Sequence, residues 1–340
     1  MSEKQNNCEI INSHLIGNHY HSQTYQTENG NVVRIFQCSR FNNPEAMVTK
    51  ICQDVSNISS INFSNGIPFQ SANRCGLSVQ IVRTYIPGSP FSEVLFDHGP
   101  RPRASSLKYA YTIIRTINEL HQRGYSAGII RPENVILTTS NDAVLVDFGV
   151  EAIYHDNVHA ENKVFSFALL GPEGASSNTS TVTQARDIFQ FGLLFYAFFV
   201  GHLPWAVVNL PRMLKQMTTG TIPIPTHLDC DVQELLRSMF HPDPATRPSA
   251  SVIMSRIETM IAKPHTSCQP VQSSYPIQPS KSFKSLGEVI AKGTGSVTTT
   301  DSKETSNMTT FPLRFRTSGL SVTKSSRDIM LPKPSTFNFE

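Results

Sequence analysis

The chain lacks the features that mark several simple classes of protein. It has six cysteines in 340 residues and no C-x-x-C pair, which argues against a structural zinc site and against a disulfide framework. Its net charge of +3 is too small to indicate nucleic acid or a membrane surface as a partner. The most apolar run, residues 191–200, is far shorter than the ~20 residues that span a bilayer. The polar start has no signal-peptide core, so we expect a soluble protein of the cytoplasm or nucleus.

Two segments without apolar patterning border a region with regular periodicity. Residues 1–11 carry no pattern, and residues 263–340 are rich in Ser, Thr and Pro. Because such segments cannot bury enough surface to offset chain entropy, we expect both to be disordered. The folded part is therefore predicted to span residues 12–262.

Strand signals come first in this region and helix signals follow. Asn29-Gly30 between β-rich flanks predicts a hairpin over residues 25–37, and residues 77–85 predict another strand. A helix is expected from Pro44 to about Ser56, with Asn43 as its cap. Apolar spacing predicts further helices over 91–96, 105–121, 187–200, 232–240 and 250–261. This order indicates an α+β protein with a β-rich lobe over about 12–86 and an α-helical lobe over about 87–262.

One stretch carries most of the functional information. Residues 120–149 read L-H-Q-R-G-Y-S-A-G-I-I-R-P-E-N-V-I-L-T-T-S-N-D-A-V-L-V-D-F-G. Protein kinases have L-H-x-x-G-x-x-H-R-D-x-x-P-E-N, then a hairpin, then D-F-G. Further matches follow in the kinase order at residues 171–173, 187–192, 201–205 and 243–248. Residues 12–262 therefore resemble a eukaryotic protein kinase domain, which implies the bilobal kinase fold.

The residues that the resemblance retains are mostly architectural. It implies a buried ion pair between Glu173 and Arg247 inside the large lobe. It also implies that Asp187 holds backbone amides of the catalytic loop. Trp205 and the Phe-rich segment before it are expected in the core.

The residues that are lost are mostly chemical. The His-Arg-Asp triplet is replaced by Ala127-Gly128-Ile129, so Ile129 stands where the family has its proton acceptor. Phe36 stands at the lysine that contacts the nucleotide phosphates, and a one-residue slip would place Ile35 there. We expect Arg34 to point away from that position by strand alternation.

The surroundings of that lysine position are also altered. Residues 16–22 keep one glycine, Gly17, where the family has the G-x-G-x-x-G loop that covers the phosphates. The helix glutamate that pairs with the lysine has no clear counterpart, and Glu45 and Asp54 are the candidates.

Two residues that bind magnesium in the family remain, Asn134 and Asp147. The resemblance implies that they could still bind Mg-ATP weakly. The alternative interpretation is that Asn134 bonds the loop backbone and Asp147 caps a turn. Arg131 replaces a lysine that touches the transferred phosphate in Ser/Thr kinases, with the same charge but another geometry.

The loss of several catalytic groups together indicates a pseudokinase, with no catalytic residue and no required cofactor. We expect a scaffold or allosteric regulator in signalling whose partners are other proteins, such as an active kinase or its substrate. One alternative is a divergent active Ser/Thr kinase that uses Asp142 or Glu133 as its base. Another is a nucleotide-binding switch without catalysis. A large-lobe domain for peptide binding alone is disfavoured by the expected hairpin and by the hinge at residues 86–88.

Overall fold

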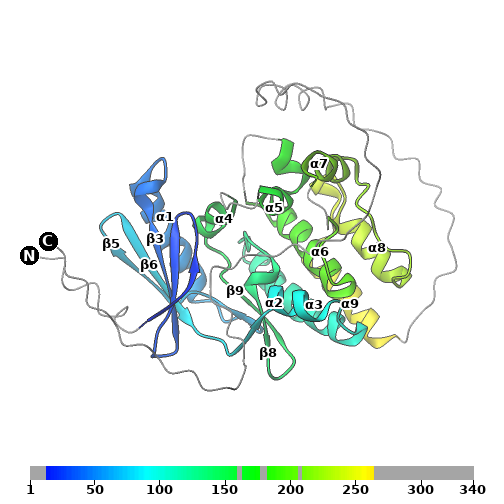
Figure 1. Ribbon diagram of the computed structural model, residues 1–340, viewed down its shortest axis with the longest axis horizontal. Coiled ribbons are helices and arrows are strands. Elements are labelled where there is room, and N and C mark those ends of the chain that lie inside the picture. Colours follow the sequence, from blue (N-terminus) through cyan, green and yellow to red (C-terminus); the bar gives the residue numbers. More distant parts are fainter. Residues whose placement is uncertain (1–12, 159–162, 177–181, 206–208, 264–340) are drawn as a thin grey trace, which may run out of the picture.

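The computed structural model describes residues 13–158, 163–176, 182–205 and 209–263. These residues form a lobe built mainly on a β-sheet and a second lobe of helices, joined side by side (Figure 1). The bilobal α+β architecture predicted from the sequence is thereby confirmed. The predicted disordered segments, 1–11 and 263–340, lie outside the described residues apart from Lys263.

The first half of the chain supplies the strands and the second half most of the helices. The strands are β1 (His14–Asn18), β2 (Ser22–Gln26), β3 (Asn31–Gln37), β4 (Gly66–Ile67), β5 (Ser71–Cys75), β6 (Ser78–Thr84), β7 (Gly88–Pro90), β8 (Val135–Thr138) and β9 (Ala143–Val146). The helices are α1 (Pro44–Ser59), α2 (Phe91–His98), α3 (Arg103–His121), α4 (Glu151–Val158), α5 (Lys163–Ser176), α6 (Gln184–Val200), α7 (Leu210–Thr219), α8 (Cys230–Met239) and α9 (Ala250–Ala262).

The small lobe is an antiparallel sheet in the order β1-β2-β3-β6-β5, with α1 packed against β5 and β6. The predicted hairpin is the β2–β3 pair, and Gly30 in its turn has a φ of 75°, a conformation that glycine adopts without steric cost. The predicted helix is α1, and the Asn43 side chain accepts a hydrogen bond from Ala46 N at 3.2 Å. It continues three residues past the predicted end, to Ser59.

The large lobe is organised around α6, which lies between α3 and α8. Almost every side chain of α6 is buried, because its Phe and Leu residues face neighbours on all sides. Thr183 caps its first turn and Gly201 ends it with a φ of 83°. Trp205 is buried as expected. A second sheet, β4-β9-β8-β7, lies beside α3 and carries the catalytic-loop region.

Three helices and three strands of the structure were not predicted from the sequence, namely α4, α5, α7, β1, β4 and β5. Cys38, Cys52 and Cys75 are free thiols, whereas Cys230 is disulfide-bonded, a cross-link that the scattered cysteine spacing did not indicate. Within the described residues, no helix has both the length and the apolar character needed to cross a membrane.

Candidate functional site

The β8–β9 hairpin brings the two conserved-type polar residues of the kinase motifs together. Asn134 directly precedes β8 and Asp147 directly follows β9, and Val135 pairs with Leu145 in the ladder. Both residues therefore lie at one end of the hairpin. Asp142 lies in the turn at the opposite end, where its carboxylate pairs with Lys108 at 2.7 Å.

The catalytic loop is held from below by α6. The buried carboxylate of Asp187 accepts hydrogen bonds from Ala127 N at 2.6 Å and from Gly128 N at 3.0 Å. His121 Nε2 lies 2.9 Å from the same carboxylate. The expected role of Asp187 is confirmed, and the loop backbone is ordered although its chemical side chains are absent.

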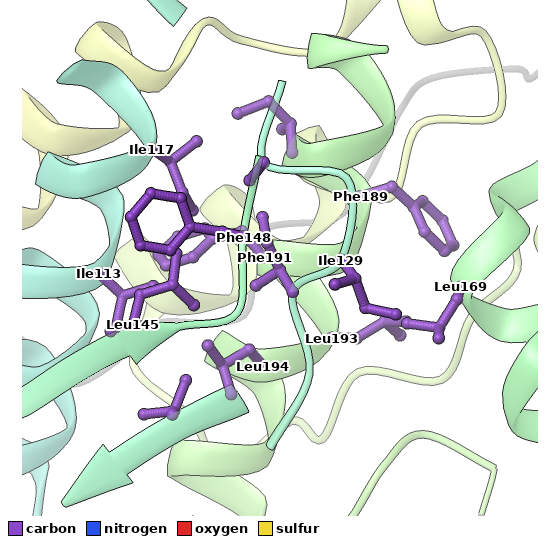
Figure 2. Packing of buried hydrophobic residues seen from close by; sticks show 14 of the residues in the cluster. Ile113, Ile117, Ile129, Leu145, Phe148, Leu169, Phe189, Phe191, Leu193 and Leu194 are labelled. Atoms are coloured by element: carbon purple, nitrogen blue, oxygen red, sulfur yellow. The ribbon is translucent and has the colours of Figure 1, made fainter. Parts of the chain in front are cut away.

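Ile129, at the position of the family's proton acceptor, is 1% exposed. Figure 2 shows its side chain beside Leu169 of α5 and beside Phe189 and Leu193 of α6, all members of one buried apolar cluster. The side chain is therefore a core residue of the large lobe. This position offers neither a proton acceptor nor a polar surface for a substrate hydroxyl.

Arg34 corrects one expectation. Its side chain is buried, and Nη1 lies 3.5 Å from Asp147 Oδ2 while Nη2 donates to Asp156 Oδ2 at 2.8 Å. The prediction that Arg34 points away was wrong, because Arg34 and Phe36 are two residues apart in β3 and so project from the same face. The Arg34 guanidinium lies over the Phe36 ring, 5.3 Å from its centroid.

A second arginine, which the sequence analysis missed, binds the same aspartate. Arg83 of β6 is buried and donates from Nε to Asp147 Oδ1 at 2.6 Å. Desolvation by burial raises the pKa of Asp147, but the charges of Arg83 and Arg34 outweigh it and hold that pKa below its usual value. Asp147 is therefore a carboxylate whose two oxygens each face a guanidinium group.

Helix α4 completes the polar cluster from the large-lobe side. Its Asp156 carboxylate is buried and accepts hydrogen bonds from His21 N at 2.6 Å, from Ser22 Oγ and from Arg34. His19 in the same turn has its pKa lowered to about 3, by burial and then by the charge of Arg34, so it is neutral at pH 7. The β1–β2 turn thus rests on α4.

The candidate acids of α1 do not turn toward Phe36. Asp54 accepts a hydrogen bond from Glu151 N at 3.0 Å and so caps the first turn of α4. Glu45 is exposed and pairs with Arg74 at 2.6 Å. The acid of α1 that is buried serves α4, which lies between the two lobes (Figure 1).

The remaining predicted residues have simpler surroundings. Glu173 and Arg247 form a two-bonded ion pair at 2.9 and 2.8 Å, as expected. Asn134 is 5% exposed, and its side-chain Nδ2 makes no hydrogen bond within the described residues, so the alternative that Nδ2 bonds the loop backbone is not borne out. Glu133 lies 3.5 Å from Arg131.

These features can be set beside known proteins. Residues 14–257 match the family described as the protein kinase domain. A probable serine/threonine-protein kinase of Dictyostelium discoideum is 24% identical over 211 residues, which are 62% of this chain and 25% of that protein. Serine/threonine-protein kinase KIN4 of Saccharomyces cerevisiae is 22% identical over 234 residues, which are 66% of this chain and 29% of that protein. A crystal structure of Rad53 1–466 in complex with AMP-PNP has a TM-score of 0.58 at 17% identity, covering 72% of this chain and 63% of that chain.

The matched region spans less than a third of either of these curated relatives, so the likeness concerns one domain of each. At 17% identity the structural likeness shows the fold alone. The family match covers most of the chain and includes both the Asp187 loop support and the Glu173–Arg247 ion pair. The chain belongs to the protein kinase domain family.

Proposed function

We propose that this chain is a kinase-fold protein that binds other proteins and does not transfer phosphoryl groups. The observation that carries the proposal is the pairing of Asp147 with Arg83 and Arg34. In a kinase that aspartate holds a magnesium ion, which neutralises charge as the phosphoryl group moves. Here two fixed guanidinium groups already neutralise it.

The residues present do not fit a magnesium–nucleotide complex in this arrangement. Arg83 Nε lies 2.6 Å from one oxygen of Asp147, a distance at which the guanidinium occupies the space that a cation would need. Repulsion between Mg²⁺ and two nearby guanidinium groups opposes metal binding further. Asn134 is the other retained ligand type, and one amide oxygen is a weak site by itself.

The alternative of a divergent active kinase needs another proton acceptor near Ile129. Asp142 lies at the far end of the β8–β9 hairpin and pairs with Lys108, and four strand residues separate it from Asp147, roughly 13 Å. Glu133 is on the same loop but faces Arg131. Neither arrangement supports a base for a substrate hydroxyl.

A non-catalytic role suits a protein whose lobes are connected by its own side chains. The contacts of α4 with Arg34, Ser22 and Asp54 join the two lobes without a ligand. A domain of fixed shape presents a constant surface, which favours a scaffold or an allosteric regulator. The relatives named as Ser/Thr kinases support a setting in signalling, where an active kinase or its substrate is the kind of partner to seek.

The proposal is tested on the purified full chain with Mg-ATP. We expect no radiolabel transfer to itself or to generic substrates, and no change in the thermal unfolding midpoint, because a ligand stabilises only in proportion to its occupancy. Label transfer that disappears in Asp147→Asn would overturn the proposal. A rise of several degrees with Mg-ATP but no transfer would favour the nucleotide-binding switch instead.

A further inference from the structure

Three hydrogen-bond donors of the small lobe converge on one carboxylate of α4. His21 contributes its backbone N–H at 2.6 Å, Ser22 its hydroxyl, and Arg34 its Nη2 at 2.8 Å. The acceptor is Asp156, which is 1% exposed, and all three donor residues are also buried. Neither carboxylate oxygen lacks a donor, since Oδ1 accepts from His21 and Oδ2 accepts from Ser22 and Arg34.

This set of donors has the chemistry of an anion site. A backbone N–H in a tight turn, a hydroxyl and a guanidinium group together recognise the oxygens of phosphate groups in many proteins. His21 and Ser22 belong to the segment 16–22, which aligns with the phosphate-covering loop of kinases. In this chain the anion that the loop holds is a side chain from residue 156, far along the sequence.

We propose that Asp156 is an internal anionic ligand. Its carboxylate fills an anion site formed by His21, Ser22 and Arg34, and so holds α4 against the small lobe without any phosphate-bearing molecule. An external phosphate group reaches this site only when the carboxylate of Asp156 has left it. The inference rests on the proposed absence of nucleotide from the cleft, and it names what regulates access to that cleft.

The other contacts of α4 explain why the anion site should persist when the carboxylate is removed. Asp54 of α1 caps the first turn of α4 at Glu151 N. Tyr154 of α4 accepts a hydrogen bond from Arg186 of α6 at 2.9 Å, and the Arg186 guanidinium lies 5.5 Å from the Tyr154 ring centroid. Because these anchors do not involve Asp156, a variant at this residue is expected to keep α4 close to its place.

The test is chemical rescue of Asp156→Ala in the full chain, without nucleotide or metal. This change deletes the carboxylate and leaves a space of about the size of formate beside three unsatisfied donors. We expect the variant to unfold at a lower temperature than the wild type. Sodium formate or inorganic phosphate should raise its midpoint by about 3 °C more than sodium chloride of equal ionic strength, as expected for a ligand near ten times its dissociation constant.

Two controls separate a bound anion from a general salt effect. Phosphate stabilises most folded proteins by exclusion from their surface, so the informative quantity is the difference between variants. Asp142→Ala also deletes an ion-paired carboxylate, but an exposed one. The wild type and Asp142→Ala should gain less than about 1 °C over chloride from either anion. Equal gains in all three proteins, or no gain in Asp156→Ala, would overturn the proposal.

If Asp156→Ala cannot be purified folded, Ser22→Ala tests the same contact more gently. The pKa of Asp156 is held low against desolvation chiefly by Arg34, then by Ser22 and His21, with His19 also nearby. A depressed pKa gives stability that is lost as the pH falls through the folded-state value. Ser22→Ala should therefore move the acid unfolding midpoint to higher pH, and an unchanged midpoint would contradict the proposal. Because neither assay contains ATP, these outcomes do not depend on the test of phosphoryl transfer.

Discussion

Replacing Ile129 with aspartate restores the residue that kinases have at this position, and we expect it to destabilise the protein without restoring activity. The side chain is 1% exposed and packs in the apolar cluster with Leu169, Phe189 and Leu193 (Figure 2). Truncating a buried isoleucine costs about 2–5 kcal/mol, and an unsatisfied buried polar group adds about 1–3 kcal/mol. The sum of about 3–8 kcal/mol is comparable with the whole stability of a typical domain, about 5–15 kcal/mol.

The assay is urea unfolding at several pH values, with Ile129→Val and Ile129→Asn as matched controls. Ile129→Val should cost about 0.5–1.5 kcal/mol, since it removes one methylene group. Burial raises the pKa of the introduced carboxyl, so Ile129→Asp should be least stable above pH ~4 and recover as the pH falls toward the unfolded-state value of ~3.9. Ile129→Asn should show no such recovery.

Two results would refute the reasoning. Stability of Ile129→Asp within about 1 kcal/mol of the wild type would mean that the side chain can leave the cluster at little cost. Gain of ATP-dependent phosphoryl transfer by this single change would mean that the lost lysine and the Arg83–Asp147 pair do not prevent nucleotide use. Catalytic groups that act as a unit are not additive, so we expect neither.

Two further variants test the buried ion pairs by urea unfolding. Arg83→Met should destabilise the domain by about 2–4 kcal/mol at pH 7 because Asp147 keeps only the 3.5 Å contact with Arg34. The pKa of Asp147 is depressed in the folded state, so this difference should shrink as the pH falls below ~3.9, and a pH-independent difference would contradict it. Glu173→Gln should cost about 3 kcal/mol by leaving a buried guanidinium group without its charge partner, whereas the exposed Glu234→Gln should cost less than about 0.5 kcal/mol, and equal costs would contradict the argument.

Local signals in the sequence predicted much of the fold. The hairpin at Gly30 and the Asn43 cap depend on neighbouring residues, and the structure has both. Segment 187–200 is apolar on all sides, which could only be a buried helix. The Glu173–Arg247 pair and the loop support by Asp187 followed from the ordered kinase motifs, not from periodicity.

The polar cluster of the cleft was not predicted because its partners are distant in sequence. Asp156 lies 122 positions after Arg34, and its helix α4 contacts elements on more than one side, so it has no single apolar face. One signal was available in β6, where Val79, Ile81 and Arg83 project from the same face. An arginine in line with two buried apolar residues indicates a buried acidic partner elsewhere.

The position of those partners bears on how the chain folds during its synthesis. Arg34 and Arg83 belong to the first lobe to leave the ribosome, but their carboxylates come from Asp147 and Asp156. At about 5–20 residues per second, the 122 positions between Arg34 and Asp156 take on the order of ten seconds to translate. During that interval the nascent small lobe holds two arginines without counter-ions, and burying them is unfavourable. Its sheet can therefore reach its final packing only after the segment containing α4 has emerged.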